Sequence, residues 1–83
     1  IVVVFCDNSL NRIELKQQAR GFPSFGTRID PTDIERLAQS MGCDGVNVGD
    51  ARGLEAALAV PRSPDRPLVI GVAIDPTQYA AQF

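Results

Sequence analysis

The chain has 83 residues, of which 45% are hydrophobic, and its eight basic and ten acidic residues give a net charge of −2. This length allows at most one small domain. Because the charges are interspersed and form no basic stripe, a nucleic-acid partner has little support. No apolar stretch reaches the about 20 residues of a membrane span, and no signal-peptide pattern is present. We therefore expect a cytoplasmic protein.

The predicted elements alternate between strands and helices along the chain. Residues 1–6 and 68–74 are continuous apolar runs, typical of strands buried on both faces, and residues 45–48 form a shorter strand. Helical patterns cover residues 10–20, a segment after Thr32, and residues 51–59, and the tail, 77–83, is either frayed or a helical turn. This order predicts an α/β fold, with a parallel sheet between helices in three α/β/α layers.

Local signals set the expected helix ends and inward faces. Thr32 and Glu35 fit a capping box, Gly42 fits a helix stop, and Asp50 fits an N-cap. In the first helix, Leu10, Ile13 and Gln17 lie on one face.

The composition also indicates a fragment and a reducing compartment. The chain begins inside a strand and has more apolar strand than so short a domain easily covers. We therefore expect residues 1–83 to be part of a longer protein. Its cysteines, Cys6 and Cys43, fit free thiols better than a disulfide. Histidine, the commonest general base and metal ligand, is absent from the chain.

Small polar residues follow the first strand directly. Asp7, Asn8, Ser9 and Asn11 come between the apolar run and the first helical pattern. In open parallel sheets, ligands bind just beyond the carboxyl ends of the strands. Turn formation and helix capping are the simpler roles for these residue types, so the pattern alone leaves both readings open.

The segment from Cys6 to Asn11 resembles the second half of the cofactor motif of thiamine diphosphate (ThDP) enzymes. That half reads as an apolar strand, Asn-Asn or Asn-Asp, two variable residues, an apolar or aromatic residue, and Gly. The elements that follow, to the last strand at residues 66–70, are similar to those of the acetolactate synthase, pyruvate oxidase and benzoylformate decarboxylase group. The resemblance implies that residues 1–83 are the C-terminal half of a ThDP-binding domain.

The resemblance implies specific roles for the residues that follow the first strand. The side chain of Asp7 and the carbonyl of Ser9 would bind Mg²⁺, which prefers oxygen ligands. Backbone N–H groups around Leu10 and Asn11 would bind the diphosphate, because a helix N-terminus suits an anion. Asn11 stands where the family has Gly, and Asn is the next most tolerant residue of a left-handed backbone.

The resemblance also concerns the substrate and the parent protein. Ile13 and Lys16 would line the substrate side of the cofactor, and Phe22 and Phe25 would lie in a loop over the site, although core, surface and anchoring roles remain open for them. The parent would act on a small 2-oxo acid as a carboligase, decarboxylase or oxidase. It would be a homo-oligomer, a dimer or tetramer, with the cofactor at a subunit interface.

Other parts of such an enzyme would lie outside this chain. A Gly-Asp-Gly metal motif belongs upstream, a catalytic Glu belongs to another domain, and FAD, where the parent has it, binds a further domain. We therefore assign no catalytic residue here and expect the 83 residues alone to be inactive.

Three alternatives to an active ThDP enzyme remain at this point. A haloacid-dehalogenase-like phosphatase would use Asp7 as nucleophile, but its second Asp would fall at Ser9. A non-catalytic flavodoxin-like interaction domain would need an acidic pair after the first strand, which Cys6 and Asp7 do not supply. A catalytically silent ThDP relative differs only in segments outside the chain.

Overall fold

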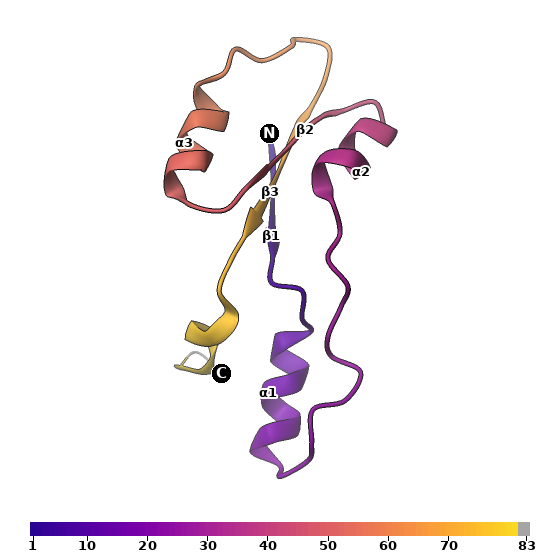
Figure 1. Cartoon of the computed structure of the whole chain (residues 1–83), viewed down its shortest axis with the longest axis vertical. Helices are drawn as coiled ribbons and strands as arrows, with labels where there is room; N and C mark the ends of the chain where they lie inside the picture. Colours follow the sequence, from indigo (N-terminus) through magenta and orange to yellow (C-terminus); the bar gives the residue numbers. More distant parts are fainter. Residues whose placement is uncertain (82–83) are drawn as a thin grey trace. The chain divides into compact units, whose positions relative to one another are not determined.

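The computed structural model describes residues 1–81 and contains three strands, three α-helices and a 3₁₀ helix (Figure 1). In chain order these are β1 (Val2–Cys6), α1 (Asn11–Ala19), α2 (Ile34–Ser40), β2 (Asp44–Val48), α3 (Ala51–Ala59), β3 (Leu68–Ala73) and η1 (Pro76–Ala81). The chain divides into two compact units. The sheet unit contains residues 1–6 and 32–74, and the α1 unit contains residues 7–31 and those from 75 onward.

The sheet unit contains a parallel sheet in the order β1-β3-β2. Along one row across the sheet, Val4 pairs with Gly71, and Gly71 pairs with Asn47. The predicted strands and their parallel direction are therefore confirmed, with bounds that differ by one residue. Strand β3 is the central strand, and its Ile70 is fully buried.

Helices α2 and α3 cover opposite faces of this sheet (Figure 1). A Cβ atom on Gly71 would lie 2.6 Å from the Cβ of Ile34 in α2, so Gly71 faces α2. A Cβ atom on Gly53 in α3 would lie 3.2 Å from the Cβ of Val48, the strand residue next to Asn47. Because neighbouring strand residues point to opposite faces, the two helices form the outer layers of the predicted α/β/α arrangement.

Strand β1 is an edge strand with little cover. It pairs only with β3 within residues 1–81, and its apolar side chains are exposed on both faces, Phe5 at 69%. Val4 is half-buried, and Val2 and Val3 are exposed. An apolar edge of this kind favours pairing with further protein.

The start of α2 differs from the predicted capping box. The N-cap is Asp33, whose carboxylate accepts the N–H of Arg36 at 3.2 Å, and not Thr32. Asn47 of β2 donates to the same carboxylate at 2.8 Å and accepts the N–H of Glu35 at 3.2 Å. The Asn47 side chain therefore accepts the Glu35 N–H that Thr32 was predicted to cap.

The other local signals agree with the structure. Gly42 follows α2 with a φ of 78°, and the Asp50 carboxylate caps α3 by accepting the N–H of Gly53 at 2.7 Å, as predicted. Both cysteines are free. Residues 76–81 form the helical turn expected of the tail, and residues 82 and 83 lie outside the described residues.

The apolar residues of α1 do not form a buried face. Leu10 and Ile13 are exposed, Ile13 at 51%, and the buried residue of α1 is Glu14. The cause is polar, because Glu14 has one partner in the turn before α1 and one in the loop after it. Apolar spacing on the helix contains no information about them.

Candidate functional site

A tight turn follows β1 and contains the predicted metal ligands. The carboxylate of Asp7 accepts the N–H of Ser9 at 3.1 Å, which is the local hydrogen bond of an Asx turn. Asn8 between them has a φ of 56°, a left-handed conformation that Asn tolerates better than most residues. The structure therefore brings the Asp7 side chain and the Ser9 backbone together, and their metal-binding role stays a prediction.

A second segment fixes this turn from the side. Ser9 forms an antiparallel bridge with Arg28. On either side of it, the Leu10 N–H donates to the Thr27 carbonyl at 2.7 Å, and the Ile29 N–H donates to the Asn8 carbonyl at 2.9 Å. Within residues 1–81 no hydrogen bond occupies the Ser9 carbonyl, so this oxygen remains for a ligand.

Helix α1 begins immediately after the turn. Its N-cap residue is Leu10, which provides no side-chain cap. The Leu10 N–H is already bound to Thr27, whereas the Asn11 N–H has no acceptor in the described part of the chain. The Asn11 side chain donates to the Pro76 carbonyl of η1 at 3.3 Å. An open helix N–H group is suited to an anion, and here it belongs to Asn11.

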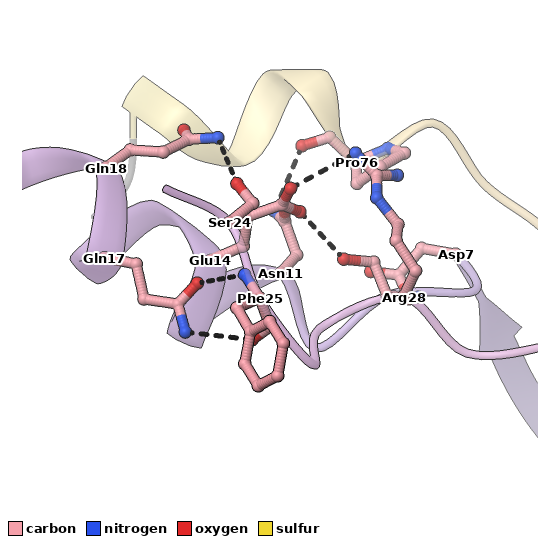
Figure 2. Close-up of polar contacts among 10 residues, drawn as sticks. Asp7, Asn11, Glu14, Gln17, Gln18, Ser24, Phe25, Arg28 and Pro76 are labelled. Carbon is pink, nitrogen blue, oxygen red and sulfur yellow. Dashed lines mark hydrogen bonds and ion pairs between the residues drawn. The ribbon is translucent and has the colours of Figure 1, made fainter. Parts of the chain in front are cut away.

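Glu14 forms a polar cluster with Ser9 and Arg28. Figure 2 shows Glu14 beside Arg28. Glu14 is 5% exposed and Ser9 is 8% exposed. The Ser9 hydroxyl donates to Oε2 of Glu14 at 3.2 Å, and Nη2 of Arg28 donates to Oε1 at 3.2 Å. Nothing in the spacing of Glu14 from Ser9 or Arg28 along the sequence predicts these contacts.

The loop between α1 and the bridge is also held by side chains. The Gln17 amide both donates to the Phe25 carbonyl and accepts the Phe25 N–H, each at 3.1 Å (Figure 2). Gln18 donates to Ser24 at 3.1 Å. The rings of Phe22 and Phe25 are exposed, so the loop is anchored through its backbone and not through these rings.

The predicted substrate-lining residues, Ile13 and Lys16, are both exposed on α1. They are three residues apart, which makes them neighbours on the helix surface. The structure thus leaves both side chains accessible, and their role stays a prediction.

Two cavities lie in different units. One of about 280 Å³ in the α1 unit is lined by Asn11, Glu14 and Arg28, among others. The other, about 230 Å³ in the sheet unit, contains none of the predicted site residues.

The donor set fits part of a Mg²⁺ site. Asp7 uses one carboxylate oxygen for the turn, and a carboxylate has about four lone-pair positions, so it retains capacity for a metal. Among the described residues, no group of three or more acidic, Cys or His side chains could hold a metal. This segment therefore has one carboxylate and one carbonyl with free lone pairs, and both are hard oxygen groups of the kind Mg²⁺ takes as ligands.

The fold and turn define an α/β domain that presents oxygen ligands and an open helix N-terminus beyond the end of a parallel strand. The family described as thiamine pyrophosphate enzyme, C-terminal TPP binding domain, matches residues 1–72, and the chain belongs to this family. This assignment decides against the phosphatase and interaction-domain alternatives. Within residues 1–81, no helix is long and apolar enough to cross a membrane.

A curated relative agrees with this family. The chain is 32% identical over 73 residues to YdaP of Bacillus subtilis (strain 168), which has the provisional name thiamine pyrophosphate-containing protein. The match covers 88% of this chain and 13% of YdaP, so the chain spans only a small part of that relative's length. No solved structure matches the chain at a significant level.

Proposed function

We propose that residues 1–83 supply Mg²⁺ and diphosphate contacts for ThDP in an acetolactate synthase-like enzyme that acts on a 2-oxo acid. The observation that supports this most is the turn of residues 7–11. There the Asp7 carboxylate, the Ser9 carbonyl and the Asn11 N–H follow one another at the start of a helix, and two of these groups have no other partner among residues 1–81.

Three residues of the turn have distinct parts in this proposal. Asp7 and Ser9 each give one oxygen to Mg²⁺, which neutralises the diphosphate. The Asn11 N–H and the positive end of the α1 dipole hold a diphosphate oxygen. The cofactor role predicted for Leu10 stays a prediction. In this structure the Leu10 N–H donates to Thr27.

ThDP, when bound, supplies the electron sink for cleavage or joining of bonds next to the 2-oxo group. The residues of this chain bind and orient the cofactor, and Ile13 and Lys16 lie on the substrate side. The proton donor to the cofactor ring comes from another domain. The parent is a homo-oligomer, a dimer or tetramer, and the rest of the parent chain completes the site.

Substitution of the proposed metal ligand tests this function. In the full-length protein, Asp7→Ala should weaken Mg²⁺-dependent ThDP binding by about 10-fold or more, because Mg²⁺ has few protein ligands to lose. Calorimetric titration of ThDP at fixed Mg²⁺ measures the effect.

The matched control is Asp30→Ala, which removes an exposed carboxylate from the same unit. It should leave the affinity unchanged. Equal affinities for wild type and Asp7→Ala would remove Asp7 from the site. Binding of ThDP without conversion of any 2-oxo acid would identify a catalytically silent relative.

A further inference from the structure

We propose that Glu14 is a positioning residue that holds Ser9 so that its carbonyl is aimed at Mg²⁺. This inference rests on the proposed function. Ser9 has three polar groups, and the structure uses two of them internally. Its N–H donates to Asp7, and its hydroxyl donates to Glu14. The carbonyl is the group that remains.

Glu14 belongs to a closed set of contacts. Arg28 pairs with Glu14 through its side chain and lies opposite Ser9 in the antiparallel bridge, whose hydrogen bonds are made by the neighbouring residues. The three residues are therefore linked pairwise, although they lie on α1, on the turn and on a segment 14 or more residues away. The Leu10 N–H shares a peptide plane with the Ser9 carbonyl and donates to Thr27, while Glu14 holds the Ser9 side chain. Held from both sides, this peptide plane has little freedom to rotate.

Burial separates this cluster from an ordinary surface ion pair. Ser9 and Glu14 are both nearly inaccessible, whereas the side chain of Arg28 is 75% exposed. The Ser9–Glu14 hydrogen bond is thus shielded from water, and loss of either partner leaves a buried polar group unsatisfied. The Arg28 contact is solvated and contributes less.

The same contact connects the two proposed metal ligands. The Ser9 N–H fixes the Asp7 carboxylate, and the Ser9 hydroxyl is fixed by Glu14. Glu14 therefore sets the separation of the two oxygens without touching the metal. Outer-shell partners of this kind typically change metal affinity by about 10- to 100-fold when they are removed.

The test compares metal affinities in the full-length protein. Ser9→Ala and Glu14→Ala should each lower the affinity of the ThDP complex for Mg²⁺ by about 10-fold. The double variant should bind Mg²⁺ no more weakly than Glu14→Ala, because both changes break the same contact between Ser9 and Glu14. Glu14→Gln, which keeps an acceptor for the Ser9 hydroxyl, should recover most of the affinity. Glu55→Ala, an exposed glutamate of α3, is the control.

Metal selectivity distinguishes positioning from a loss of stability. Mg²⁺ demands near-octahedral geometry, and Ca²⁺ accepts more varied arrangements. In the variants, Mg²⁺ affinity should therefore fall more than Ca²⁺ affinity, as measured by titration of each ion into the protein with ThDP. A general loss of folding would weaken the binding of both ions equally.

The outcomes separate this inference from the proposed function. If Asp7→Ala weakens binding but Ser9→Ala, which removes a single hydroxyl, changes neither affinity nor selectivity, then Glu14 has no positioning role and the function stands. If Asp7→Ala has no effect, both proposals are wrong. Additive losses in the double variant would also overturn the positioning role.

Discussion

At the scale of single residues, two glycines allow α2 to lie close to the sheet. A Cβ atom at Gly71 would lie 2.6 Å from Ile34, and one at Gly45 would lie 2.8 Å from both Ala38 and the backbone oxygen of Glu35. These separations are far below normal contact distances. The small residues on β2 and β3 therefore determine how closely the helix approaches.

Substitution of these glycines should destabilise the sheet unit. Gly71→Ala should lower the free energy of unfolding by about 1–3 kcal/mol, because a methyl group must be forced into a packed interface. Gly49→Ala, where an added Cβ meets nothing within 4 Å, should change it little. Denaturant unfolding of the full-length variants measures the difference, and equal midpoints would show that α2 can move away at little cost.

Residue type alone could not decide the role of Glu14. Its letter fits a solvated helix position equally well, and its burial follows from the antiparallel bridge between Ser9 and Arg28. By contrast, Asp7 could be singled out from the sequence, because a carboxylate directly after an apolar strand is a local pattern. The position of Asp7 is a local pattern in the sequence, whereas the burial of Glu14 depends on a segment far away along the chain.

At the scale of elements, the start of α2 depends on β2. The hydrogen bond from Asn47 is the largest cause of the lowered pKa of Asp33, followed by the backbone hydrogen bond from Arg36. A folded pKa below the ordinary value of 3.8 means that the carboxylate stabilises the fold above that pH. This stabilisation is lost as the pH falls through the lowered folded pKa.

Removal of Asn47 should therefore shift the titration of Asp33. In Asn47→Ala the pKa of Asp33 should rise toward its ordinary value, and the first turn of α2 should exchange its amide protons faster. NMR titration of the Asp33 carboxyl measures the shift. Gln39→Ala, an exposed position on α2, is the control. An unchanged Asp33 titration in Asn47→Ala would show that Arg36 and the Glu35 N–H account for the lowered pKa without Asn47.

The elements themselves were largely predictable. Continuous apolar runs predicted β1 and β3, and Asp50 predicted the start of α3, because these signals lie within a few residues of one another. The capping box at Thr32 failed for the opposite reason. A side chain from β2 supplied the partner, and helix propensities contain no information about a neighbouring strand.

At the scale of the whole molecule, the proposed function gives the chain only part of a cofactor site. In that proposal the chain offers one carboxylate and one carbonyl to a metal that takes about six oxygen ligands. Strand β1, which leads to this turn, has exposed apolar side chains on both faces. We expect the rest of the parent chain or another copy to cover them.

The 83 residues in isolation should therefore bind no ThDP at sub-millimolar concentrations and convert no 2-oxo acid. Calorimetry of the isolated chain with ThDP and Mg²⁺ measures this directly, and the full-length protein is the control. Saturable, Mg²⁺-dependent binding with a micromolar Kd would show that these residues form a complete site.

The sequence by itself determined the class of fold, the parallel strands and the turn at Asp7, because each depends on short-range order in hydrophobicity and turn chemistry. Only the tertiary structure decided which amides remain open, that Leu10 donates to Thr27 while Asn11 does not, and that Glu14 is buried against Ser9. These features depend on segments that meet across a loop. Their pairing is set by the register of the bridge at Ser9 and Arg28, which no local pattern along the chain encodes.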